Sequence, residues 1–221
     1  MKILLTIIIC FYTASGLMAD DGKYEKAMKK NISMIDSAHD VTAMIDVANR
    51  FERIANAEKD KWLPYYYASL MYAITCFTDT VAEKKDGYLD KADYFVHIAD
   101  SLEPNESENY VMMGMIAQGR MQIDPMNRYM KYGPISTKNF QKAMELDTLN
   151  PRPEYLIGVS TYYTPEQFGG GLKRAKPILE KSLAKFNQFV PDNDQMPNWG
   201  RQSVEGMLNE IKEKTEMQEQ N

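Results

Sequence analysis

Three polar residues near the middle of the chain have a spacing that suits a metal site. Asp93, His97 and Asp100 lie four and three residues apart, so one helical face can carry all three. Carboxylates and an imidazole can together bind a divalent metal. The same segment, however, has an apolar stripe that must face inward, made of Ala92, Val96 and Ala99. We therefore predict an exposed charge pair here and no metal site.

A run of glycines followed by two cations suggests an anion site. Gly169, Gly170 and Gly171 precede Lys173 and Arg174. Free amides at a helix N-terminus, with cations beside them, attract phosphate or carboxylate. A tight turn between packed helices needs the same glycines. No strand precedes the run and the lysine-serine or lysine-threonine ending of a phosphate-binding loop is missing, so a nucleotide site is not predicted. A structural turn and a contact with a small anion or partner both stay open.

The sequence has little material for catalysis. Its two histidines are His39 and His97, and it has no nucleophile-elbow, zinc-protease or paired-cysteine motif. We therefore expect no enzymatic activity, no cofactor and no bound metal. Acidic residues exceed basic ones by 31 to 26, and the basic residues are not clustered, which argues against nucleic-acid binding.

Residues 1–19 have the layout of a secretory signal. Lys2 is followed by an apolar run from Ile3 to Tyr12 and then by small residues up to Ala19. The run is shorter than the roughly 20 apolar residues that cross a bilayer. We predict cleavage after Gly16 or Ala19, export to the periplasm or the cell exterior, and no stable membrane insertion after cleavage.

The two cysteines support neither a lipid anchor nor a disulfide. Ile9 precedes Cys10, where a lipoprotein signal requires a small residue, so lipidation is not predicted. Removal of the signal would leave Cys76 alone in an apolar run. We predict that Cys76 is a buried hydrophobic residue and not a reactive thiol.

The remaining chain is predicted to be all-helical, with one inward stripe repeated four times. The stripes begin at positions 48, 92, 136 and 175, which are 44, 44 and 39 residues apart. We expect loops within the helix pairs at residues 79–86, 124–134 and 164–171. Further helices are expected within residues 20–38 and from 198 to 214, covering the two ends of the stack.

This organisation resembles the tetratricopeptide repeat (TPR) family over about residues 40–190. The first helix of one copy has the aromatic and small-residue pattern of that family at Tyr65, Ala68, Ser69 and Tyr72. The loops resemble those of small exported TPR proteins of Gram-negative bacteria. The resemblance implies a right-handed α-solenoid of helix pairs with terminal capping helices, forming one domain over residues 20–215 before a polar tail at 216–221.

The TPR resemblance also implies a binding scaffold whose first helices line a concave groove. Transferred residue by residue, the groove positions are Tyr66, Leu70, Ile74, Val111, Met115, Gln118, Leu156, Ser160 and Tyr163. Tyrosine and methionine are abundant in the chain, 14 and 16 residues, and would make such a groove apolar and adaptable. Helical spacing equally allows these residues to be core.

Two functions follow as hypotheses. The first is an exported, non-enzymatic TPR scaffold that binds a protein or peptide in this groove. The alternative is a small-molecule, anion or metal-binding accessory protein of the cell envelope, which would use the turn at 169–174 and the segment at 125–132.

Overall fold

The computed structural model describes residues 14–219, and the side chains of residues 22–217. Residues 1–13 of the predicted signal lie outside the described residues, and residues 14–19 begin the first helix. The described chain is helical and contains no strand, which confirms the predicted all-α class. Its helices are α1 (Ala14–Ile32), α2 (Val41–Ala57), α3 (Trp62–Thr78), α4 (Ala82–Leu102), α5 (Ser107–Ile123), α6 (Pro125–Leu146), α7 (Arg152–Tyr163), α8 (Leu172–Phe186) and α9 (Arg201–Glu219), with short 3₁₀ turns η1 (Ile35–Ser37) and η2 (Glu166–Phe168).

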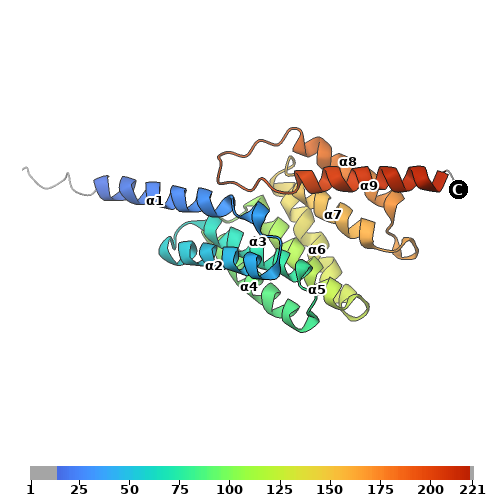
Figure 1. Cartoon of the computed structure of the whole chain (residues 1–221), viewed down its shortest axis with the longest axis horizontal. Coiled ribbons are helices and arrows are strands. Elements are labelled where there is room, and N and C mark those ends of the chain that lie inside the picture. Colours follow the sequence, from blue (N-terminus) through green and yellow to red (C-terminus); the bar gives the residue numbers. More distant parts are fainter. Residues whose placement is uncertain (1–13, 220–221) are drawn as a thin grey trace, which may run out of the picture.

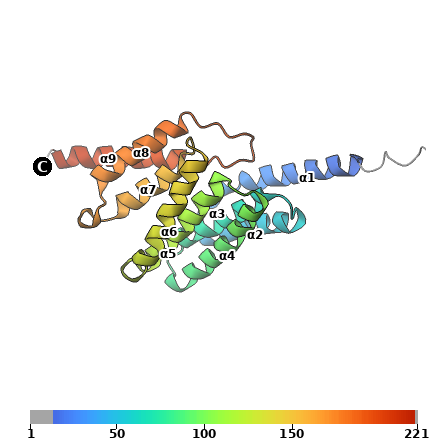
Figure 2. The ribbon, with the colours of Figure 1, turned by 180° about the vertical axis from the view of Figure 1, so that it is seen from behind.

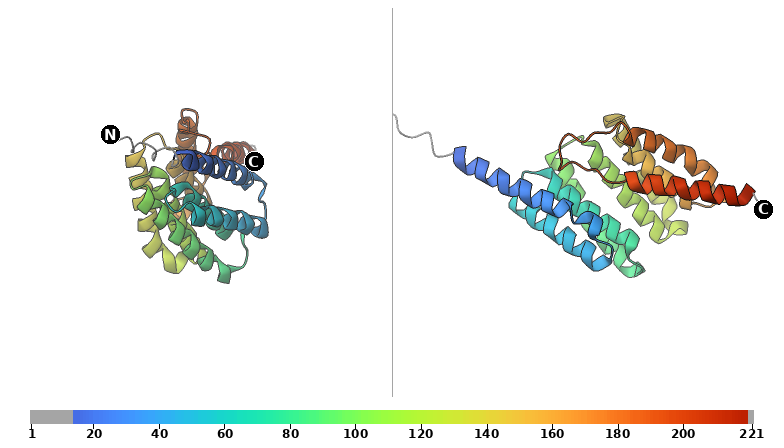
Figure 3. Two further views of the ribbon diagram at one scale, coloured as in Figure 1. Left: turned by 90° about the vertical axis from the view of Figure 1, so that its left-hand side faces the viewer. Right: turned by 45° about the horizontal axis from the view of Figure 1, so that its top comes forward.

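Consecutive helices run antiparallel and stack side by side. In Figure 1 the stack from α2 to α6 continues into α7 and α8, and α9 lies along their outer side. Figure 2 shows the same stack from behind, with α6 and α7 diverging from the point where they are joined. Figure 3 shows α1 extending past the stack at its N-terminal end. Among the described helices none combines the length and hydropathy of a membrane span.

The predicted inward stripes are confirmed as the contacts between paired helices. The first stripe residues, Ala48, Ala92, Ser136 and Ala175, are all buried. The residues three or four positions further on are also buried: Phe51, Val96, Phe140 and Leu179. Small side chains at these positions let neighbouring helices approach closely, and the large ones fill the space between them.

Close approach is clearest between α5 and α6. A Cβ atom placed on Gly114 would lie 2.4 Å from the Phe140 ring, so this ring packs directly against the backbone of α5. Cys76 is buried as predicted, and burial raises the pKa of its thiol to about 11.

Two of the predicted loops are wrong in extent. Most of residues 124–134 form the first turns of α6, because Asp124 caps the helix by accepting from the Asn127 amide at 3.3 Å and Pro125 occupies its first position. The helix continues through Pro134. Likewise α4 begins at Ala82, inside the predicted loop at 79–86. At the C-terminus α9 begins at Arg201 and not at 198, and it includes residues 216–219 of the predicted tail.

The buried hydrophobic residues form two clusters. The larger one extends from Tyr24 on α1 to Leu156 on α7. The smaller one lies between α8 and α9 and includes Leu179 and Val204. The segment at residues 187–200, which we call the connecting segment, runs between these two helices and bonds back to the larger cluster: Tyr67 donates from its hydroxyl to the Gln195 carbonyl at 2.8 Å.

Candidate functional site

The predicted groove residues are mostly core. Tyr66, Leu70 and Val111 are fully buried, and Met115, Gln118 and Leu156 nearly so. Ile74 and Ser160 are partly buried, and Tyr163 alone of the set is exposed. The reason is that α3 packs on α2, α4 and α5, while α5 packs on α3, α4, α6 and α7, so neither helix has a free face. The buried members of this set stabilise the stack and are not available as a docking surface.

Asp93, His97 and Asp100 lie on α4 outside its apolar stripe, as predicted. His97 and Asp93 form an exposed pair, with 3.7 Å between Nε2 and Oδ1. Asp100 is half-buried one turn further on. In the part of the chain that the structure describes, no three acidic, histidine or cysteine side chains are placed to share a metal ion.

The glycine run is a structural turn. The amides of Gly169, Gly170 and Gly171 donate to the backbone carbonyls of Glu166, Pro165 and Thr161 at 3.0, 3.2 and 2.9 Å. Gly169 and Gly171 have φ of +91° and +96°, the left-handed region that favours glycine. An anion therefore finds none of these three amides free. The side chains of Lys173 and Arg174 remain exposed beside the turn.

Gly170 tests this structural role. A Cβ atom there would lie 2.0 Å from the Thr164 carbonyl oxygen, so the backbone must move to admit one. We expect Gly170→Ala to lower the free energy of unfolding by about 1–3 kcal/mol in urea denaturation. Gly87→Ala is the control, since it lies inside α4 with nothing within 4 Å and should raise stability by about 0.5–1 kcal/mol. Equal stability of the parent and Gly170→Ala would contradict the steric argument.

A buried charge network joins α3, α5, α7 and the connecting segment. Arg152 is fully buried, and its Nη1 donates to Glu108 Oε1 at 2.8 Å. Glu108 Oε2 accepts from the Tyr66 hydroxyl at 2.9 Å, and the Trp199 indole donates to that hydroxyl at 2.8 Å. Burial raises the pKa of Tyr66 well above its usual value. The network therefore joins segments that are far apart in sequence.

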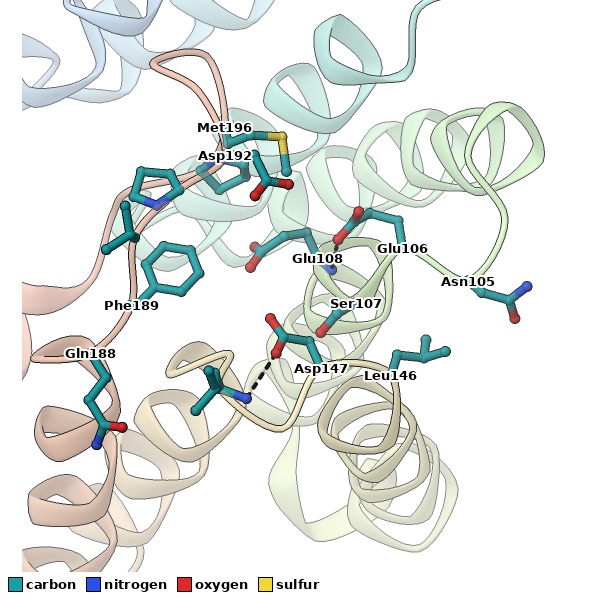
Figure 4. A pocket seen from close by; sticks show the side chains of 14 residues that line it. Asn105, Glu106, Ser107, Glu108, Leu146, Asp147, Gln188, Phe189, Asp192 and Met196 are labelled. Carbon is teal, nitrogen blue, oxygen red and sulfur yellow. Dashed lines mark hydrogen bonds between the residues drawn. The ribbon is translucent and has the colours of Figure 1, made fainter.

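A pocket of about 370 Å³ lies beside this network (Figure 4). It is enclosed by the start of α5, the end of α6 and the connecting segment. Its wall carries the acidic side chains of Glu106, Asp147 and Asp192, and no lysine or arginine among the described residues lines it. Glu106 and Asp147 accept from the backbone amides of Glu108 and Leu149 at 3.1 and 2.8 Å. The pocket would repel an anionic ligand.

A second hollow, of about 440 Å³, lies between the start of α4, the end of α5 and the start of α6. Its arginines are already paired: Arg128 makes two 2.7 Å contacts with Asp86, and Arg120 makes one of 2.7 Å with Asp90. Arg128 holds the pKa of Asp86 below its usual value. These pairs connect three helices and are satisfied without a ligand.

Large apolar side chains are exposed where α6 begins and α7 ends. We call this set the α6–α7 apolar face; it comprises Met126, Tyr129, Met130, Tyr163 and Phe168, all at least 61% exposed. Because the two helices are antiparallel, their exposed ends lie at the same end of the stack, where Figures 1 and 2 show them diverging. Exposed large apolar side chains on neighbouring helix ends are candidates for a binding surface.

Helix geometry gives each of the two tyrosines of this face the inward phase of its own helix. Tyr129 lies seven residues before the buried Ser136, and Tyr163 lies seven residues after the nearly buried Leu156. Seven residues are about two helical turns, so each tyrosine shares the inward side of its helix. Gln118 of α5 donates to the Leu156 carbonyl at 3.2 Å, which shows that this side of α7 faces α5. The tyrosines are exposed because no helix covers them there.

The sequence indicated this face only in part. Residues 125–132 belonged to the alternative site, and Tyr163 to the groove, but the exposure of Met126 and Met130 was not predicted. Their signal is weak: they are apolar residues outside the inward stripe of α6, in a segment that is otherwise polar.

Comparisons with known proteins point to a haemophore. No family model matches the chain, and no curated protein does. Among solved structures, the HusA haemophore from Porphyromonas gingivalis is similar at 30% sequence identity and a TM-score of 0.76, over 87% of this chain and 94% of that one. The prediction of a protein or peptide partner is wrong, because its groove residues are core and the similar structure is a haemophore. Identity of this level over nearly the whole of both chains shows that the chain belongs to the same family as the HusA haemophore.

Proposed function

We propose that the chain is an exported, non-enzymatic protein that binds haem. The observation that carries this proposal is the similarity to a haemophore at 30% identity over 94% of that chain. Haem binding corresponds to the second hypothesis drawn from the sequence, a small-molecule-binding accessory protein. Export is supported by the signal-like residues 1–19.

The α6–α7 apolar face is the surface that fits this ligand best. A porphyrin is a large flat apolar ring, and tyrosine and methionine side chains offer broad, polarisable contact area. Haem supplies an iron that takes ligands from the protein, and thioether and phenol groups are known iron donors. Met126, Met130, Tyr129 and Tyr163 bring both kinds of donor to this face.

Histidine is not a donor at this face. His97 lies on α4 in its pair with Asp93, and His39 lies before α2. The pocket in Figure 4 fits less well, because haem carries two propionate carboxylates and that wall is acidic.

The direct test is a titration of the purified chain with ferric haem, followed by the Soret absorbance. We expect saturable binding of one haem per chain, with quenching of tryptophan emission over the same range. A difference spectrum that grows linearly with haem, as it does in buffer, would overturn the proposal. Repeating the titration after thermal unfolding separates binding by the fold from nonspecific adsorption.

A further inference from the structure

Two cations near the α6–α7 apolar face differ from the other basic residues of α8 and α9. Within the described chain, the other lysines and arginines of these helices all have an acidic partner within 4.0 Å: Lys176, Lys181, Lys185, Arg201, Lys212 and Lys214. Lys173 and Arg174 have none among residues 14–219 and are exposed. These two charges therefore form no ion pair within the described chain.

The position of Arg174 connects it to the aromatic end of the face. A Cβ atom on Gly169 would lie 3.1 Å from Arg174 Nη1, so the guanidinium lies over the turn between η2 and α8. Phe168, which is 70% exposed, immediately precedes Gly169. Tyr163 ends α7 five residues earlier. The turn thus places a guanidinium without an acidic partner over Gly169, the residue after the exposed Phe168.

The cations of the second hollow are less suitable. Arg120 and Arg128 are held by Asp90 and Asp86. Lys131 has no acidic partner among the described residues, but it lies five residues after Met126, about 140° around the helix from it. A ligand seated on Met126 and Tyr129 would not reach that side of α6.

We propose that Lys173 and Arg174 bind the carboxylate groups of the ligand. The proposal rests on the haem-binding function above and adds which edge of the ligand is recognised. A porphyrin lying against Tyr163 and Phe168 would direct its two propionates to these side chains. Guanidinium and ammonium groups bind carboxylates through charge-assisted hydrogen bonds. Ring and carboxylates would then be held by separate parts of one surface.

The fold does not depend on these two cations. They lie in the first turn of α8, at the positive end of the helix, where added positive charge is unfavourable. Glutamine at both positions should therefore leave the fold intact. A loss of binding in such a variant then reports on the ligand contact.

The test uses metal-free protoporphyrin and its dimethyl ester, which lacks the carboxylates. Tryptophan quenching is measured for the parent, for Lys173→Gln/Arg174→Gln, and for the control Lys176→Gln/Lys212→Gln. The control removes the same charge from exposed pairs at 3.9 and 4.0 Å. We expect the first variant to bind the diacid at least tenfold more weakly, the ester to be unaffected by it, and the control to match the parent.

The other outcomes of this test separate a failure of the carboxylate contact from a failure of haem binding. If the variant binds the diacid as tightly as the parent, or loses diacid and ester equally, the carboxylate contact is overturned while haem binding stands. If the parent itself binds neither porphyrin and no haem, the proposed function fails together with this inference. Diacid affinity that falls with added salt in the parent, and not in the variant, would be further support.

Discussion

Replacing Arg152 with methionine is expected to lower the free energy of unfolding by about 3–5 kcal/mol, because the change leaves the buried Glu108 carboxylate without its cation. Arg152 is fully buried and Glu108 is 4% exposed. Methionine has a similar length and fills much of the same space, so the loss reports mainly on the charge.

The expected loss is large because Arg152 also holds the connecting segment. Its Nη2 donates to the Pro197 carbonyl, and its guanidinium carbon lies 4.8 Å from the Phe189 ring centre and 5.3 Å from that of Trp199. All three belong to residues 187–200. Without the guanidinium this segment loses its central contact with α7, and the Trp199 environment should change.

Urea denaturation followed by tryptophan emission measures the effect. Arg50→Met is the control, since Arg50 pairs with Asp46 at 2.8 Å on the exposed side of α2 and should cost less than about 1 kcal/mol. Adding Glu108→Gln to Arg152→Met should recover part of the stability, because the uncompensated charge disappears. A double variant less stable than Arg152→Met would show that the carboxylate stabilises the fold by other contacts.

The helix pairs were predictable because their contacts are local in sequence. Apolar residues such as Ala92, Val96 and Ala99 recur every three or four positions, and this spacing alone predicts a buried face. The same reasoning places Phe140 and Leu179 in the core, as found. The repeated helix pairs and the all-α class both follow from this pattern.

The network around Glu108 was not predictable, because it joins residues far apart in the chain. Arg152 lies 44 residues after Glu108, and Trp199 lies 133 residues after Tyr66. A charged residue in a helix pattern is ordinarily expected outside, and only the tertiary arrangement buries this pair. TPR membership and a right-handed solenoid stay predictions.

Most residues predicted to line a groove lie in the core, for a related physical reason. A groove lining and a core stripe have the same helical spacing, so Tyr66 and Leu70 could not be assigned to one or the other from periodicity. Their full burial decides for the core. Tyr163 has the same inward phase but lies at the end of α7, where α7 diverges from α6. Whether its side chain is exposed therefore depends on the angle between the two helices, which periodicity does not predict.

The second large effect is expected in haem binding itself. Replacing Tyr129 and Tyr163 with alanine should weaken haem affinity about a hundredfold, equivalent to about 2.8 kcal/mol. Burying a large apolar side chain contributes about 1.5–3 kcal/mol when complete, and each ring would be only partly covered by a ligand. Soret titration of the double variant measures the loss directly.

The double variant should fold like the parent, since both side chains are more than 60% exposed. Tyr94→Ala is the matched control for removing an exposed tyrosine, because Tyr94 is 63% exposed on α4 and is not part of the α6–α7 apolar face. It should bind haem within about twofold of the parent, within the ordinary small effect of a surface change.

A third variant separates the two candidate surfaces. Leu149→Ala/Val190→Ala removes exposed apolar groups from the wall of the pocket in Figure 4, which lies at the end of α6, whereas Tyr129 lies near its start. If this variant loses haem and Tyr129→Ala/Tyr163→Ala does not, the ligand lies in the acidic pocket, and the charge argument against that pocket is wrong. If only the tyrosine variant loses haem, the divergence of α6 and α7 is the feature that creates the site. Were these two helices packed along their full length, Tyr129 and Tyr163 would be covered.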